Sequence, residues 1–337
     1  MRAVLIVNPN ATSTTPAGRD LLAHALESRV DLTVVHTDHR GHAIEIGQQA
    51  AADGTDVVIV HGGDGTVNEV VNGILGHSNG TRASTAVGVV PGGSANVFAR
   101  SLGISADPLE ATNQLVDLLA GASGATGDIT GASGATGDAG DHRRGVPWRR
   151  IGLMDCGERW AVFTAGLGVD GDVVAAVEAQ RAKGKKVSAA RYIRVAVREA
   201  LANARKPPTL TLQLPDSEPI PGVHFAFVSN SSPWTYANDR PVWTNPTTTF
   251  ETGLGVFATT SMNVWANLKL ARQMLSPTPH LRAAQLIRED DLPWLRVTSD
   301  TPAACQIDGD FIGLRRTMTF TAVPGALSVV APPAKSR

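Results

Sequence analysis

The chain has few cysteines, no dominant sign of charge and no long hydrophobic run, and each of these absences excludes a class of protein. Only two cysteines, Cys156 and Cys305, occur in 337 residues, and their spacing is not that of a metal site. We therefore expect reduced thiols in a cytoplasmic protein. The 30 Lys and Arg residues nearly balance the 31 Asp and Glu residues. This balance argues against a general nucleic-acid-binding protein, because such proteins are usually basic.

No stretch approaches the roughly 20 consecutive apolar residues of a membrane span. The apolar run at the start, in MRAVLIVNPNA, is too short for a signal sequence and predicts a strand instead. Any membrane contact is therefore expected to be peripheral. The hydrophobic content of 42% is enough for packed cores, and the length predicts two domains.

The most informative stretch is VVIVHGGDGTVNEVVN, at residues 57–72. Its first four residues are apolar and predict a buried strand of a parallel sheet. The strand is followed by Gly62, Gly63, Asp64, Gly65 and Thr66. Apolar residues then recur at helical spacing, so the stretch predicts a strand, a glycine turn and a helix. Anions bind at such a helix N-terminus, glycines let the backbone approach a phosphate, and the carboxylate of Asp64 indicates a metal ion beside it.

Two further predicted strands end in loops of small and polar residues. Residues 3–7 lead into NPNAT, and residues 86–90 lead into PGGSAN. Helices predicted at residues 21–26 and 43–52 flank another strand at residues 32–36, and this alternation is typical of a parallel α/β sheet. Because ligands bind at the carboxyl ends of such strands, we expect the three loops to form one site.

The second half of the chain has a different pattern. From residue 209 onward, short apolar segments such as TLTLQL, HFAFVSN and MTFTA are separated by turn residues and predict an antiparallel sandwich, with one helical insertion at residues 264–275. The sequence GASGATGD occurs twice between residues 121 and 138, which predicts a disordered loop at residues 121–141. A basic run at residues 181–186 precedes a predicted helix at residues 188–203 and could meet anionic headgroups.

HGGDGTVNEVVNGI resembles the nucleotide-binding motif of the diacylglycerol kinase catalytic-domain family, which includes bacterial diacylglycerol kinases, sphingosine kinases and ceramide kinases. The loops NPNAT and PGGSAN are similar to the family's other loops. The resemblance implies an NAD kinase/diacylglycerol kinase-like fold of the α/β plus β class. It places a parallel α/β ATP-binding domain at residues 1–155, a β-sandwich substrate domain at residues 156–312, and strands that return to the first domain at residues 313–337.

The resemblance implies that ATP binds across the three loops, with Mg²⁺ as the cofactor. The expected ATP-binding residues are Asn8, Pro9, Asn10, Thr12, Thr37, Gly62, Gly63, Asp64, Gly65, Thr66, Asn68, Gly92, Gly93, Ser94 and Asn96. Asp64 and Asp155 are expected near the metal, and Asp308 is expected to hold its own loop or a metal network. Asp170, in AGLGVDG, is similar to an aspartate that recognises the lipid headgroup in sphingosine kinases, although a turn or helix-cap role is equally open.

The chain departs from the family pattern at three positions. Where the family has Asp-Gly-Glu, with the glutamate as the base that activates the acceptor hydroxyl, this chain has Asp308, Gly309 and Asp310. Asp310 is therefore the implied base, and with Asp64 it makes up the expected catalytic pair. On the residues alone, this loop is also typical of a tight hairpin turn. Val97 replaces a frequent aspartate. Thr252 stands where the family binds a structural Mg²⁺, so that we expect this ion to be absent or held by Glu251.

The function implied by the resemblance is that of an ATP-dependent lipid kinase, with diacylglycerol as the first choice of substrate and phosphatidic acid as the product. The expected partners are the lipid substrate, a peripheral membrane surface and, as one option, a second copy in a homodimer. The expected location is the cytoplasm, with peripheral association with a membrane. Two alternatives stay open: an NAD kinase-like enzyme with a soluble acceptor, and a nucleotide-binding regulatory protein without activity, which the three departures favour.

Overall fold

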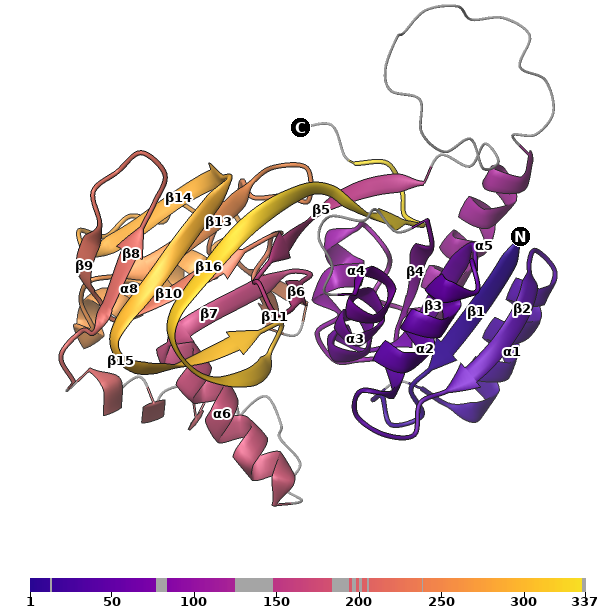
Figure 1. Cartoon of the computed structure of the whole chain (residues 1–337), viewed down its shortest axis with the longest axis horizontal. Coiled ribbons are helices and arrows are strands. Elements are labelled where there is room, and N and C mark those ends of the chain that lie inside the picture. Colours follow the sequence, from indigo (N-terminus) through magenta and orange to yellow (C-terminus); the bar gives the residue numbers. More distant parts are fainter. Residues whose placement is uncertain are drawn as a thin grey trace, which may run out of the picture.

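The computed structural model describes residues 1–12, 14–76, 84–124, 148–183, 194–195, 198–199, 202–204, 206–237 and 239–334. An α/β half and a strand-rich half lie side by side (Figure 1). This arrangement confirms the predicted α/β plus β class. The predicted loop at residues 121–141 lies outside the described residues apart from its first four. So do half of the basic run at residues 181–186 and most of the helix expected at residues 188–203.

The sheet of the α/β half is parallel and has the strand order β4-β3-β1-β2. Its strands are β1 (Arg2–Val7), β2 (Asp31–His36), β3 (Val57–Gly62) and β4 (Ala86–Pro91). Its helices are α1 (Pro16–Glu27), α2 (His42–Ala52), α3 (Asp64–Leu75), α4 (Val97–Ser101) and α5 (Pro108–Gly124). Helix α1 packs against α5, and α2 packs against α3. Strands β3 and β4 are buried along their whole length, as central strands of a covered parallel sheet should be.

The strand-rich half is antiparallel, in the order β14-β13-β10-β7-β15-β16. These strands are β7 (Thr164–Gly168), β10 (Phe225–Ser229), β13 (Leu254–Thr259), β14 (Leu286–Leu292), β15 (Trp294–Ile307) and β16 (Asp310–Val329). The remaining strands are β5 (Arg149–Asp155), β6 (Trp160–Ala161), β8 (Leu210–Gln213), β9 (Ile220–Val223) and the separate pair β11 (Thr235–Ala237) and β12 (Arg240–Val242). Helices α6 (Val169–Ala182) and α8 (Val264–Met274) complete this half. No helix in the described ranges is long and apolar enough to cross a membrane.

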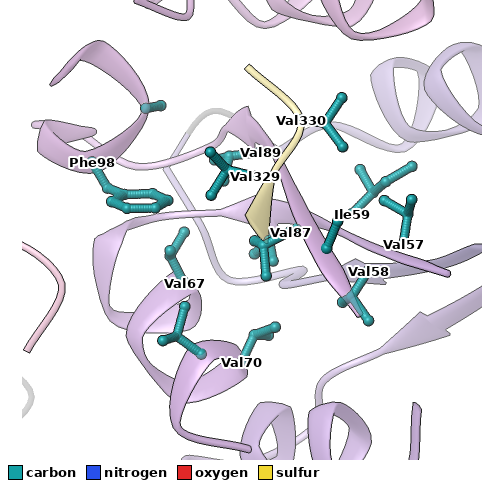
Figure 2. Packing of buried hydrophobic residues seen from close by; sticks show 14 of the residues in the cluster. Val57, Val58, Ile59, Val67, Val70, Val87, Val89, Phe98, Val329 and Val330 are labelled. Atoms are coloured by element: carbon teal, nitrogen blue, oxygen red, sulfur yellow. The ribbon is translucent and has the colours of Figure 1, made fainter. Parts of the chain in front are cut away.

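Strand β16 belongs to both halves of the molecule. Over most of its 20 residues it pairs with β15 and β5, and Phe320 lies in the core of the strand-rich half. Near its end, Val329 pairs in parallel with Val87 of β4, so that one sheet runs through both halves. Figure 2 shows Val329 and Val330 among the side chains of β3, β4 and α3. The α/β core is therefore completed by the end of the chain.

Gly73 of α3 lies so close to α2 that a side chain has no room. A Cβ at this position would overlap with the carbonyl oxygen of Ile44. We expect Gly73→Ala to lower the free energy of unfolding by about 1–3 kcal/mol, because overpacking forces the backbone to shift, even though alanine favours a helix. Urea denaturation measures the change. Gly65→Ala in the first turn of the same helix is the control, since a Cβ there meets nothing within 4 Å. Equal stability of the two variants would contradict the close packing of α2 and α3.

Candidate active site

A cavity of about 690 Å³ lies at the carboxyl ends of the four parallel strands. Most of the residues predicted to bind ATP line it, namely Asn8, Asn10, Thr12, Thr37, Gly63, Asp64, Gly65, Thr66, Gly93 and Ser94. The structure does not place the others on the cavity wall, namely Pro9, Gly62, Asn68, Gly92 and Asn96. The three loops expected to form one site are thus brought together.

The two glycine loops of the cavity pack directly on each other. The N–H of Gly92 donates to the carbonyl oxygen of Gly62 at 2.8 Å. A Cβ at Gly93 would lie 2.8 Å from the Cα of Gly63, closer than real Cβ contacts come. Gly92 and Gly93 are therefore required by the contact between loops, whatever the cavity holds. Gly65 is different, because a Cβ there would meet nothing within 4 Å. It lines the cavity at the N-terminus of α3, where the first N–H groups of the helix have no partner in the helix.

Asp64 joins the first glycine loop to the second. Its two carboxylate oxygens accept the N–H groups of Val97 and Phe98, each at 3.0 Å, and so cap helix α4. Burial raises the pKa of Asp64, and these N–H groups partly offset the effect. Asn96, just before α4, has a φ of 48° and bonds both the N–H and the carbonyl of Gly93. Asn96 therefore shapes the PGGSAN loop and does not line the cavity.

Of the two carboxylates expected to hold Mg²⁺, only one lines the cavity. Asp64 offers a carboxylate on the cavity wall, and oxygen ligands are those that Mg²⁺ prefers. Asp155 does not line the cavity, and its Oδ1 accepts the N–H of Gly157 at 2.7 Å in the turn between β5 and β6. The geometry thus offers Asp64 as a ligand for Mg²⁺ but does not bring Asp155 to the same wall.

The rim of the cavity carries one group of three side chains, among the described residues, that could hold a metal ion. Oδ1 of Asp38 contacts Nδ1 of both His39 and His42, the latter at 2.7 Å. The two rings stack with their centroids 4.9 Å apart. Imidazole ligands suit zinc or copper rather than Mg²⁺, so this group is chemically distinct from the carboxylate of Asp64.

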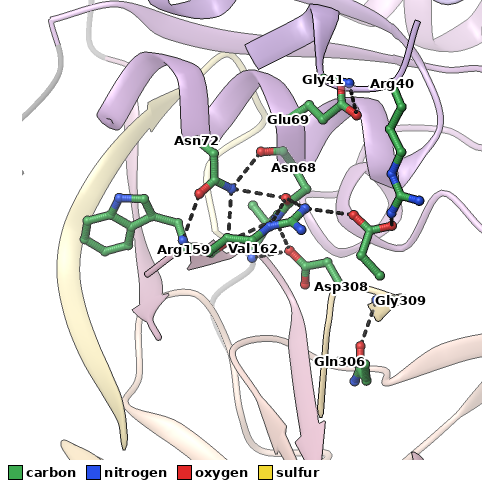
Figure 3. A network of polar contacts seen from close by, with 12 residues as sticks. Arg40, Gly41, Asn68, Glu69, Asn72, Arg159, Val162, Gln306, Asp308 and Gly309 are labelled. Carbon is green, nitrogen blue, oxygen red and sulfur yellow. Dashed lines mark hydrogen bonds and ion pairs between the residues drawn. The ribbon is translucent and has the colours of Figure 1, made fainter. Parts of the chain in front are cut away.

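A buried polar network joins the two halves below the cavity (Figure 3). Asn68 of α3 donates to Oδ2 of Asp308 at 2.6 Å and to the carbonyl oxygen of Trp160 at 3.0 Å. Arg159 donates to Oδ1 of Asn68 through its Nε at 2.9 Å. Asn72, one turn later, accepts the N–H of Trp160 at 2.9 Å. Asn68, although it follows the glycine motif directly, therefore contacts the strand-rich half and is fully buried.

Asp308 is the centre of this network. Its carboxylate accepts the N–H groups of Val162, Phe163 and Thr164 at 2.6–3.0 Å, besides the amide of Asn68. With φ angles of 50° and 81°, Asp308 and Gly309 are the two turn residues of the β15–β16 hairpin, so the tight-turn interpretation describes the backbone. These donors fit the prediction that Asp308 holds its loop, whereas a metal ion at this carboxylate would have to displace them.

Asp310 belongs to the strand-rich half and does not line the cavity, but it contacts a residue of the cavity wall. Its Oδ1 accepts a hydrogen bond from Arg40 at 2.9 Å, and its Oδ2 accepts one from Arg159 at 2.8 Å. Arg40 also binds Glu178 of α6 at 3.1 Å and lines the cavity. Neither arginine was identified from the sequence, because neither lies in a recognisable motif. Arg40 stands three residues after Thr37, and this position beside a strand-end loop is the only signal that could have found it.

Asp170 lies in the first turn of α6 and is buried. Its Oδ2 accepts a hydrogen bond from Nε2 of Gln306 at 2.6 Å, and Oε1 of Gln306 accepts the N–H of Gly309 at 2.8 Å. Asp170 is thus connected through one side chain to the turn that carries Asp310. Burial with only one hydrogen-bond donor raises the pKa of Asp170 to about 7.

Residues 2–122 match the family model described as "Diacylglycerol kinase catalytic domain". A protein named "Probable lipid kinase YegS-like" from Chromohalobacter salexigens is 38% identical over 96 residues, 28% of this chain and 30% of that protein. A diacylglycerol kinase from Staphylococcus carnosus is 32% identical over 124 residues, 34% of this chain and 37% of that protein. The chain thus spans only about a third of the length of these relatives. The match of residues 2–122 to this family model confirms the resemblance seen in the sequence.

The crystal structure of a diacylglycerol kinase from Bacillus anthracis superposes on the whole chain. The TM-score is 0.68 at 16% identity, over 99% of this chain and 97% of that chain. At this identity the similarity shows the fold, and it confirms the NAD kinase/diacylglycerol kinase-like arrangement of both halves.

The elevated pKa of Asp170 predicts a pH-dependent stability. Because the folded protein holds this proton up to about pH 7 and the unfolded chain releases it near pH 4, the free energy of unfolding falls as the pH rises through this window. We expect the stability of the wild type relative to Asp170→Asn to fall by about 2–3 kcal/mol between pH 5 and pH 8. Urea denaturation of both proteins at both pH values gives this double difference. A difference that does not change with pH would show that Asp170 is ionised throughout.

Proposed function

We propose that the protein is an ATP-dependent lipid kinase that transfers the γ-phosphoryl group of ATP to the hydroxyl group of diacylglycerol and yields phosphatidic acid. One observation carries the proposal. Arg40 lines the cavity at the N-terminus of α3 and also binds Asp310, which comes from the other half. A phosphate-binding helix end and a carboxylate from a second half are thus placed on either side of one cationic side chain.

The nucleotide side of the proposal rests on Gly65 and the N-terminus of α3. Phosphate oxygens favour the N–H groups of a helix N-terminus, and the missing side chain at Gly65 leaves this helix end open. Asp64 would hold Mg²⁺ on the cavity wall, where the ion would neutralise phosphate charge. We propose that Asp155 contacts the ion only through water, because it lies off the cavity wall. Phosphoryl transfer depends on this kind of positioning and charge neutralisation.

On the acceptor side, Asp310 is the proposed general base. The lipid oxygen forms a bond to the γ-phosphorus, the bond from this phosphorus to the bridging oxygen breaks, ADP leaves, and Asp310 takes the proton of the hydroxyl. A base must come within about 2.6–3.2 Å of the hydroxyl oxygen, so one arginine has to release its carboxylate oxygen. Arg40, with 65% of its side chain exposed, is the one free to move, and in the cavity its charge meets the transferred phosphoryl group.

Asp170 supports the acceptor side of the site indirectly, through Gln306 and the β15–β16 turn. Because it is buried and bonds Gln306, which in turn bonds Gly309, we assign it a positioning role on the turn of Asp310. Its proposed part in headgroup selection is exerted through this turn. A diacylglycerol substrate resides in a bilayer, and for this reason the proposal includes a cytoplasmic enzyme that associates peripherally with a membrane.

The nucleotide site is tested by Gly65→Ala. We expect at least a tenfold loss of affinity for Mg²⁺–ATP, because the added methyl group occupies the open helix end, with no loss of stability. Isothermal titration calorimetry measures the affinity. Gly121→Ala is the matched control, since a Cβ there also meets nothing within 4 Å but lies on α5, away from the cavity. Unchanged affinity in Gly65→Ala would exclude α3 as the phosphate-binding element.

The acceptor site is tested by transfer of labelled phosphate from ATP to diacylglycerol in mixed micelles with Mg²⁺. We expect Asp310→Asn to lower kcat by roughly 10²–10⁴-fold while ATP affinity stays unchanged, because general-base catalysis contributes that much. Asp310→Glu restores the carboxylate and should recover part of the rate. Asp20→Asn, on the exposed surface of α1, serves as the control.

The other outcomes of this assay separate the alternatives. Transfer that persists in Asp310→Asn would remove the proposed base and leave the nucleotide site in place. Phosphorylation of NAD in place of lipid would favour an NAD kinase-like enzyme with a soluble acceptor. ATP binding without turnover on any acceptor would favour a regulatory protein. The two ion pairs of Asp310 would then have a structural role only.

A further inference from the structure

Helix α8 and its C-cap expose a cluster of large apolar side chains. The exposed fractions are 53% for Val264, 79% for Trp265, 53% for Leu268 and 47% for Leu275. The other exposed large apolar residues in the described ranges are scattered over separate elements, namely Leu21, Val34, Ile44, Leu109 and Leu314. Single exposed apolar residues are ordinary, whereas a contiguous group indicates a surface that binds something.

The four side chains share one face of the helix. At about 100° per residue, Val264, Trp265, Leu268 and Leu275 fall within a sector of about 100°. Leu270 lies on the other side and is 3% exposed, packed with Phe257 and Leu281. A surface helix ordinarily has one apolar face toward the core and a polar face toward water. Helix α8 therefore has a second apolar face that the core does not use.

The surroundings of this face are basic. Between Glu251 and Glu289 the chain has no acidic residue, and this segment contains Lys269, Arg272, Arg282 and Arg288. Lys269, Arg272 and Arg282 are exposed and make no ion pair with another described residue. The N–H of Arg282 donates to Oε1 of Gln273 at 2.8 Å, so this arginine is held beside the end of α8.

We propose that α8 docks the protein on the surface of an anionic lipid bilayer, with Trp265 and Leu268 inserted among the headgroups. Tryptophan favours the membrane–water interface, and an apolar face flanked by lysine and arginine is the pattern of a helix that lies in this interface. A second copy of this chain does not fit the charge, since a two-fold contact through α8 would bring Lys269, Arg272 and Arg282 against their own copies.

Docking through α8 would leave the nucleotide cavity in water. Helix α8 belongs to the strand-rich half, whereas the cavity lies at the ends of the parallel strands of the other half (Figure 1). Phe225 of β10 packs against the cluster that contains Val173 of α6 and against the cluster that contains Leu270 of α8, so both helices pack near the same strand. The inference adds a membrane surface to the proposed function, but binding itself requires no kinase activity.

Sedimentation with vesicles of phosphatidylcholine containing 30% phosphatidylglycerol tests the surface. We expect the wild type to bind, and the double variant Trp265→Ser/Leu268→Ser to lose at least tenfold in partition coefficient. Lys269→Gln/Arg272→Gln should lose binding to a similar extent and remove most of its dependence on salt. Leu109→Ser, 56% exposed on α5, is the control that should bind like the wild type. Unchanged circular dichroism and melting temperature establish that the variants are folded.

Absence of wild-type binding, or equal binding by Trp265→Ser/Leu268→Ser, would overturn the inference. So would a dimer in solution that dissociates in this variant, because α8 would then contact a second copy. The kinase proposal fails separately. In detergent micelles, which present the substrate without a bilayer, the α8 variants should keep the wild-type rate, and a protein that binds vesicles but phosphorylates no lipid would refute only the proposed function.

Discussion

The arrangement of the site depends on the hydrogen bonds that Asp308 accepts. This buried carboxylate takes three backbone N–H groups from the segment after β6 and one amide hydrogen from α3. A buried carboxylate is tolerated only where such donors satisfy it. The hydrogen bonds therefore hold the β15–β16 hairpin, the segment after β6 and helix α3 in one relative position. Two residues further on, Asp310 is thereby held where Arg40 of the cavity wall and Arg159 can bind it. The position of the proposed base, Asp310, thus depends on the hydrogen bonds that Asp308 accepts.

The cavity itself illustrates how one motif can have two separate causes. Gly63, Gly92 and Gly93 permit two loops to touch, and they would be needed for this contact in a protein that binds nothing. Gly65 has no such neighbour, so no contact within the described residues requires its missing side chain, and the proposed phosphate site gives it a role. The same distinction applies to the aspartates. Asp64 caps α4 and at the same time offers a carboxylate to the cavity. Structural and chemical roles are thus combined at the junction of β3 and α3.

The sequence was sufficient to predict those features that are local. Strands β1 to β4 were recognisable from apolar runs, and the three loops from glycine and asparagine directly after them, because a parallel sheet gathers its strand ends at one edge. Two helices are not predicted: α4 has only five residues, and α5 was overlooked although Ala111, Leu115 and Leu119 recur at helical spacing. Asn68 was assigned to the nucleotide because it lies in the glycine motif, but the helix turns it toward Trp160, a partner 92 residues away. The ion pairs of Arg40 and Arg159 with Asp310 span 270 and 151 residues, and no pattern in a single sequence records such distances.

The path of β16 has a consequence for how the protein is made. The parallel sheet begins with residue 2, but its edge at β4 pairs with Val329 of β16, a residue far later in the sequence than β4. During synthesis the α/β half therefore leaves the ribosome with an unpaired strand and an incomplete core. Its final consolidation has to wait until β16 has been made. A growing chain of this protein exposes this sheet edge in the meantime, and such an edge is where a chaperone would act.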